Sequence, residues 1–157
     1  MERSLDSFNI GPGSIIAGRF EVCERIGSGG MGQVYRVFDR ELDNQVVAVK
    51  LLHPFLAQDE SVFRRFRNEV LVARSLSHPN IVRTHDMGHT GEGYTYISME
   101  YVDGVSLRER LCQRTGESPT EKISPQPMPL RDAAATMLQI LAGVAYAHGK
   151  GVIHRDL

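Results

Sequence analysis

A glycine-rich turn and a lysine inside an apolar strand are the features of this chain best suited to chemistry. Gly27, Gly29 and Gly32 have the spacing G-x-G-x-x-G, which on its own is also found in plain turns. Glycine allows close backbone approach, so the N–H groups of such a turn can close over phosphates. Lys50 stands in the run Q-V-V-A-V-K-L-L, where an ammonium group needs an anionic partner.

The residues on either side of the glycines separate the possible kinds of phosphate site. Phe20, Val22 and Ile26 fit a strand before the turn, and residues 34–38 form a second β-rich run after it. A dinucleotide-binding oxidoreductase fold would need a helix directly after the glycines. The G-K-S/T ending of the Walker-type loop is missing as well. The pattern therefore predicts a strand–turn–strand hairpin.

A carboxylate on the next helix is the expected partner of Lys50. Apolar residues recur at i, i+4, i+8 and i+11 from Val62, which predicts a helix around residues 59–76. Glu69 falls on the apolar face of that helix, where a carboxylate is costly unless a cation meets it. The alternative is that Glu69 bends outward to water.

In these residues the chain resembles the protein kinases, and most closely the eukaryotic-like Ser/Thr kinases of bacteria. The family pattern G-x-G-x-x-G-x-V followed by V-A-x-K is matched by residues 27–34 and 47–50. Residues 152–157, V-I-H-R-D-L, match the start of the catalytic loop H-R-D-L-x-x-x-N. The resemblance extends from about Phe20 to Leu157.

The resemblance implies an α+β fold. A kinase-like N-lobe, with an antiparallel five-stranded sheet and one helix, would precede the first helices of an incomplete α-helical C-lobe. A flexible leader over 1–19 would be followed by a truncated kinase domain over 20–157. That domain would comprise the N-lobe (20–99), the hinge (100–104) and the start of the C-lobe (105–157).

Patterning and turn residues locate the individual elements. Three strands are expected within 20–52, two more around 81–85 and 94–99, a short helix over 107–111 and a long one over 131–148. The Ser/Thr/Pro-rich segment 115–129 predicts a mobile surface loop.

The resemblance also implies the site residues. The expected catalytic residues are Asp156, to orient the substrate hydroxyl, and the pair Lys50 and Glu69, in which Lys50 holds the α- and β-phosphates. The backbone of Glu100 and Val102 would bind the adenine edge. The expected ATP-binding residues are Ile26, Gly27, Ser28, Gly29, Gly30, Met31, Gly32, Gln33, Val34, Ala48, Lys50, Met99, Glu100 and Val102.

The implied function is transfer of the γ-phosphate of ATP, with Mg²⁺, to Ser or Thr hydroxyls of a protein substrate. The asparagine and the D-F-G aspartate that bind the metal are expected beyond Leu157, so we expect no metal ligands and no phosphotransfer in this chain alone. No residue from 133 to 147 is charged, which is typical of a helix inside a helical layer and favours the N-terminal part of a longer kinase. The alternative is a non-catalytic nucleotide-binding or interaction module built on a truncated kinase lobe.

The composition argues against several other classes. With 18 basic and 19 acidic residues, the net charge of −1 predicts no strong binding to nucleic acid. Cys23 and Cys112 fit no metal-binding spacing, which favours reduced thiols in the cytoplasm. No segment resembles a signal sequence or a membrane span, although an anchor after residue 157 stays open, as does the oligomeric state.

Overall fold

The computed structural model describes residues 10–54, 60–114, 123–125 and 127–153. They divide into two units, one up to Tyr101 and one from Val102. This division falls within residues 100–104, the segment expected as a hinge, while the assignment of domains stays a prediction.

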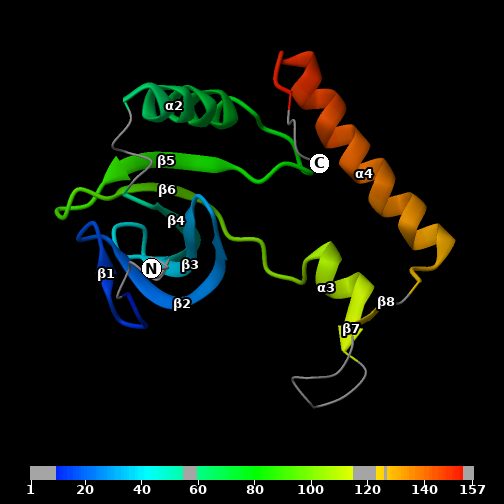
Figure 1. Cartoon of the computed structure of the whole chain (residues 1–157), viewed down its shortest axis with the longest axis horizontal. Helices are drawn as coiled ribbons and strands as arrows, with labels where there is room; N and C mark the ends of the chain where they lie inside the picture. Colours follow the sequence, from blue (N-terminus) through cyan, green and yellow to red (C-terminus); the bar gives the residue numbers. More distant parts are fainter. Residues whose placement is uncertain (1–9, 55–59, 115–122, 126, 154–157) are drawn as a thin grey trace, which may run out of the picture. The chain divides into compact units, whose positions relative to one another are not determined.

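A six-stranded antiparallel sheet in the order β1-β2-β3-β4-β6-β5 forms most of the first unit (Figure 1). Each neighbouring pair is antiparallel, and the central strands β3 and β4 pair over their whole length. The strands are β1 (Ile15–Ile16), β2 (Phe20–Gly29), β3 (Gly32–Asp39), β4 (Gln45–Leu52), β5 (Thr84–His89) and β6 (Thr95–Glu100).

One face of this sheet forms the core of the first unit. Tyr35 and Val37 of β3 alternate with residues of the other face, as do Val49 and Leu51 of β4, and all four side chains are completely buried. The ring of Phe20 meets that of Tyr96 edge-to-face at 5.4 Å between centroids. Burial therefore alternates along β3 from Gln33 onward, whereas Val47, Ala48 and Val49 of β4 are buried in succession.

Two turns between strands contain residues that suit their backbone conformation. Asp43 and Asn44 connect β3 to β4 with φ of 49° and 58°, a left-handed conformation that Asn and Asp tolerate better than most residues. In the β5–β6 turn, the Thr90 N–H donates to the Tyr94 carbonyl at 2.8 Å, and Gly93 has φ of 85°.

Two expectations about the strands need correction. Within the segment expected as a flexible leader, Ile15–Ile16 form β1 on the edge of the sheet, and Ile16 is only 3% exposed because it completes the apolar core. The strand β5 begins at Thr84 rather than at Ile81, because the Ile81 N–H donates to the His78 carbonyl in a turn.

The helix α2 (Glu60–Arg74) confirms the helix expected around residues 59–76. It lies alongside β5 (Figure 1), and its inward residue Val70 is buried. Near its end, Arg74 Nη1 lies 3.1 Å from Asp86 Oδ1 on β5.

The second unit contains the helices α3 (Leu107–Leu111) and α4 (Leu130–Gly149), close to the expected ranges. Ser106 and Glu109 form a capping box at the start of α3, with the Ser106 N–H donating to Glu109 Oε2 at 2.7 Å. The loop expected over 115–129 is wrong in part, because β8 (Ile123–Pro125) pairs with β7 (Cys112–Arg114) through backbone hydrogen bonds. Among the described helices, none has the length and hydropathy that a membrane crossing needs.

Candidate active site

The glycine turn is a hairpin between β2 and β3, as predicted. Gly27 pairs with Val34, Ser28 with Gln33, and Gly29 with Gly32. The chain continues from Gly32 directly into β3 instead of a helix. This arrangement removes the dinucleotide-binding alternative, which depends on a helix N-terminus at that point.

Lys50 lies in a cross-strand row with the hairpin. It is paired with Val34 on β3, which is in turn paired with Gly27 on β2. Directly opposed residues of antiparallel strands project from the same face of a sheet. The half-buried Lys50 therefore shares a face with Gly27 and Val34, opposite to the face that forms the core.

The glycines of the hairpin differ in what the fold demands of them. Gly32 has φ of 154°, and a Cβ there would come within 1.9 Å of the Leu51 carbonyl oxygen, so this position needs glycine for folding. At Gly29 and Gly30 a Cβ would meet no atom within 4 Å. The missing side chains at these two positions leave open space along the hairpin, which would suit a ligand that approaches the backbone.

The helix α2 packs against the face of the sheet that carries Lys50. The ring of Phe63 lies 6.1 Å from that of His89, which shares a face of β5 with Met87. Met87 pairs with Ile97, and Ile97 pairs with Lys50. The helix and the lysine thus lie on the same side of the sheet, as the expected ion pair requires.

Two of the expected catalytic residues cannot be located at the level of side chains. Glu69 belongs to α2, but its side chain is not among those described, so the Lys50–Glu69 pair stays a prediction. Asp156 lies outside the described residues.

The expected adenine-binding residues belong to the sheet of the first unit and to the hinge segment. Ala48 pairs with Met99, and these two residues share the face of Lys50. Ala48 is buried, Val34 and Met99 are half-buried, and Ile26 and Met31 are exposed. Val102 belongs to the second unit and is exposed.

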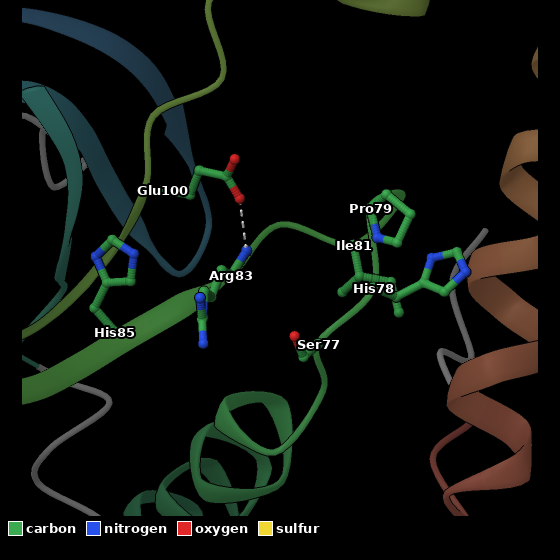
Figure 2. Close-up of a pocket in the computed structure, with 7 residues that line it drawn as sticks. All are labelled: Ser77, His78, Pro79, Ile81, Arg83, His85 and Glu100. Carbon is green, nitrogen blue, oxygen red and sulfur yellow. Dashed lines mark hydrogen bonds between the residues drawn. The ribbon is translucent and has the colours of Figure 1, made fainter.

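The hydrogen bonds of Gln33 and Glu100 limit which of their groups could contact a nucleotide. Gln33 has a buried side chain whose Oε1 accepts a hydrogen bond from the Tyr35 hydroxyl at 2.6 Å, so only its backbone could contact a nucleotide. The Glu100 N–H donates to the Arg83 carbonyl at 2.8 Å, and its carboxylate accepts from the Arg83 N–H (Figure 2). The Glu100 carbonyl oxygen is therefore the backbone group to consider for adenine.

The pocket of Figure 2 overlaps the expected ATP site only at Glu100. It has a volume of about 440 Å³ and lies where the segment between α2 and β5 passes the end of β6. Its lining residues are Ser77, His78, Pro79, Ile81, Arg83, His85 and Glu100. In this segment His78 Nδ1 accepts a hydrogen bond from the Asn80 N–H.

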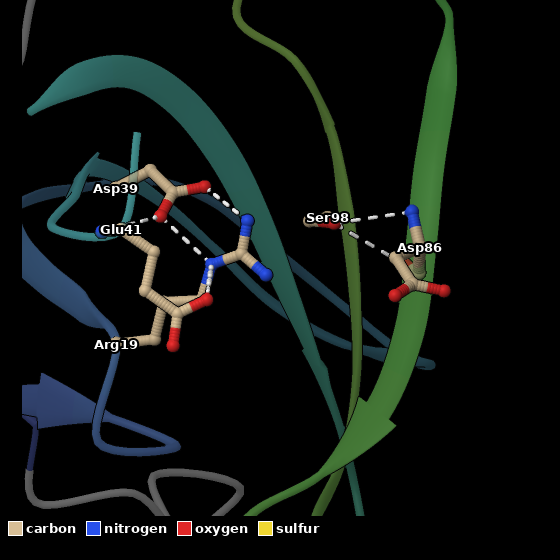
Figure 3. Close-up of polar contacts among 5 residues, drawn as sticks. All are labelled: Arg19, Asp39, Glu41, Asp86 and Ser98. Carbon is tan, nitrogen blue, oxygen red and sulfur yellow. Dashed lines mark hydrogen bonds and ion pairs between the residues drawn. The ribbon is translucent and has the colours of Figure 1, made fainter. Parts of the chain in front are cut away.

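An ion pair that sequence reasoning missed holds the base of the hairpin. Arg19 Nε and Nη2 donate to the two carboxylate oxygens of Asp39 at 2.7 and 2.6 Å, and Glu41 lies 3.4 Å from Nε (Figure 3). The hydrogen bond from Arg19 lowers the pKa of the Asp39 carboxyl, although burial opposes this change. The pair links the start of β2 to the end of β3, where Phe20 and Asp39 are cross-strand partners. On the neighbouring strands shown in the same figure, the Asp86 N–H donates to Ser98 Oγ.

A glycine hairpin above a strand lysine, with a helix packed on the same face, is the arrangement of a protein kinase N-lobe. The chain belongs to the protein kinase family, since the family model described as "Protein kinase domain" matches residues 20–157. The resemblance and the fold class expected from the sequence are thereby confirmed.

Relatives of the chain include bacterial Ser/Thr kinases. The chain is 39% identical over 145 residues to serine/threonine-protein kinase PrkC of Bacillus subtilis, covering 92% of this chain and 20% of that protein. It is 42% identical over 148 residues to probable serine/threonine-protein kinase SCO3848 of Streptomyces coelicolor, covering 90% of this chain and 20% of that protein. The chain thus spans about a fifth of the length of these curated relatives.

A solved structure has the same fold. The crystal structure of the Mycobacterium tuberculosis PknI kinase domain matches with a TM-score of 0.73 and 32% identity. The match covers 94% of this chain and 55% of that one.

Proposed function

We propose that this chain binds ATP under the β2–β3 hairpin and forms the nucleotide-binding part of a cytoplasmic Ser/Thr protein kinase. The observation that carries the proposal is the cross-strand row of Gly27, Val34 and Lys50, which brings a cation to the face of the hairpin. The open space at Gly29 and Gly30 supports it, because phosphates could approach the backbone N–H groups there.

The proposed contacts combine positions in the sheet with roles that the kinase pattern gives to the matching residues. Lys50 would bind the α- and β-phosphates, and Glu69 would hold its ammonium group in place. Ala48, Val34 and Ile26 would form the apolar walls for adenine, beside Met99. The carbonyl oxygen of Glu100 and the backbone of Val102 would bind the polar edge of the base.

The proposed reaction transfers a phosphoryl group to a protein hydroxyl. The substrate oxygen forms a bond to the γ-phosphorus as the bond to the β,γ-bridging oxygen breaks, and ADP leaves. Asp156 would accept the hydroxyl proton. Magnesium would neutralise the phosphate charge, and its ligands are proposed to come from residues other than these 157.

Transfer and binding can be tested separately in the full-length protein. Wild type and Asp156→Asn are incubated with radiolabelled ATP, Mg²⁺ and a basic protein substrate, while ATP affinity is measured by calorimetry. We expect the variant to retain ATP affinity and to lose transfer by roughly a hundredfold or more. Binding without transfer in the wild type would favour the non-catalytic module, and the absence of ATP binding would overturn both functions.

A further inference from the structure

Strand β3, one arm of the hairpin, carries two buried polar side chains on the face opposite to that of Lys50. Gln33 and Tyr35 are 1% and 0% exposed, and the Tyr35 hydroxyl donates to Gln33 Oε1 at 2.6 Å. Uncharged polar groups with so little solvent contact are costly to bury without a partner. This hydrogen bond joins two residues of one strand, so its direct constraint acts on β3.

Val34, which lies between Gln33 and Tyr35, projects toward the expected ATP site. Because side chains alternate along a strand, Val34 projects to the face of Lys50 while Gln33 and Tyr35 project to the buried face. The hydrogen bond between the side chains of Gln33 and Tyr35 restricts the backbone on both sides of Val34. It therefore restricts the orientation of Val34 and of the peptide groups around it.

Two further contacts fix the same arm to β4. The Cα of Gly32 lies so close to the Leu51 carbonyl that a Cβ could not be accommodated. The His53 N–H donates to the Met31 carbonyl at 3.1 Å, which ties the tip of the hairpin to the end of β4. By contrast, a Cβ at Gly29 or Gly30 would meet no atom within 4 Å. The support for the hairpin is thus concentrated at its β3 arm.

We infer that the Tyr35–Gln33 hydrogen bond positions the glycine hairpin for the phosphates of ATP, with Tyr35 and Gln33 acting as positioning residues. The inference rests on the proposed function, because it concerns the same nucleotide. It assigns the side chain of Gln33 a role behind the hairpin in place of the nucleotide contact expected from the sequence. A loosened hairpin would weaken binding of the phosphates more than binding of adenosine, which lacks them and would meet only the side chains of Ile26 and Val34 in the hairpin.

The test compares ATP with adenosine in the full-length protein. Tyr35→Phe keeps the buried ring and removes the hydroxyl. We expect its Kd for ATP to rise about three- to tenfold, the usual effect of one net hydrogen bond, while its Kd for adenosine changes less than about twofold. Tyr96→Phe is the matched control, because Tyr96 faces the same core from β6 and should leave both constants unchanged. Amide hydrogen exchange should accelerate only within residues 27–35 of the Tyr35→Phe variant.

A second variant guards against a folding defect. Gln33→Met removes the acceptor with a side chain of similar length, and we expect the same selective loss of ATP affinity. Equal changes for ATP and adenosine, no change for either, or failure of both variants to fold would overturn the inference. A wild type that binds ATP in those experiments would leave the proposed function standing, whereas a wild type without ATP binding would overturn both.

Discussion

Lys50 and Val34 are cross-strand partners in the β3–β4 ladder. The one cationic residue of β4 therefore lies beside an apolar residue of the hairpin, two positions after Gly32. This relationship follows from the register alone and does not depend on how the two units are placed. It puts the Lys50 side chain on the face of the sheet to which Val34 and its partner Gly27 belong. The predictions on nucleotide binding depend on this pairing.

The first prediction concerns the charge of Lys50. In Lys50→Met, a side chain of similar length loses the ammonium group, and we expect the Kd for ATP to rise roughly tenfold to a hundredfold, the range of a hydrogen bond to a charged group. Adenosine affinity should stay the same. Lys150→Met is the control, since Lys150 follows α4 and is exposed beside Tyr146. Equal losses for both lysine variants in calorimetric titrations would contradict a specific role of Lys50.

The second prediction concerns the partner of Lys50. If Glu69 pairs with Lys50, the effects of Glu69→Gln and Lys50→Met on the free energy of unfolding will not add, and the coupling will be about 1 kcal/mol or more. A double-mutant cycle in urea measures this term. Glu92→Gln, in the exposed β5–β6 turn, should give additive effects when combined with Lys50→Met. Additivity for Glu69 as well would mean that its carboxylate bends outward to water.

The third prediction separates two glycines of the same motif. Gly32→Ala should lower the free energy of unfolding by about 2 kcal/mol or more, because a Cβ would clash with the Leu51 carbonyl and the φ of 154° disfavours a side chain. Gly29→Ala should change stability by less than about 1 kcal/mol, since its Cβ would meet no atom within 4 Å. It should nevertheless raise the Kd for ATP severalfold.

Gly11→Ala serves as the control for Gly29→Ala. Gly11 also has open space around a Cβ, and it lies outside the hairpin. Its substitution should leave both stability and ATP affinity unchanged. A Gly29→Ala variant that matches Gly11→Ala in ATP affinity would show that the ligand does not approach the hairpin at Gly29.

The strands of the core could be predicted from the sequence because they are short runs rich in β-branched and aromatic residues, with no helical period. Tyr35 and Val37 on β3, and Val49 and Leu51 on β4, belong to those runs and are buried together. The alternation of side chains along a strand could have placed Gln33 on the buried face, because it is two residues from Tyr35. Gln33 was instead assigned to the nucleotide site because it lies within the glycine motif of residues 27–34.

Register was harder to predict, because it depends on contacts between strands. In β2, the pairing with β3 shifts between Val22 and Glu24 and again between Arg25 and Gly27, which leaves Cys23 and Ile26 unpaired. Such bulges change the face that a residue occupies, and no residue type in β2 signals them. The Arg19–Asp39 ion pair was missed for the same reason, since it depends on the pairing of Phe20 with Asp39.

The fourth prediction concerns the pH dependence that this ion pair creates. Hydrogen bonding from Arg19 lowers the pKa of Asp39 in the folded state. A carboxyl whose pKa is lowered by folding stabilises the protein above its unfolded pKa, and this stability is lost as the pH falls through the folded pKa. At pH 7, Asp39→Asn should therefore lower the free energy of unfolding by about 2 kcal/mol, the range for a hydrogen bond to a charged group.

The loss caused by Asp39→Asn should shrink as the pH falls below about 4, because the Asp39 carboxyl of the unfolded chain becomes protonated there while its lowered pKa keeps that of the folded protein ionised to a lower pH. Urea unfolding of both proteins between pH 7 and pH 3 measures this difference. Glu24→Gln is the control, because the Arg36–Glu24 pair has a similar distance of 2.7 Å but both side chains are far more exposed than that of Asp39. Solvent screens such a pair, so its removal should have a smaller effect. A difference between wild type and Asp39→Asn that stays constant down to pH 3 would mean that the Asp39 carboxylate does not stabilise the base of the hairpin through its charge.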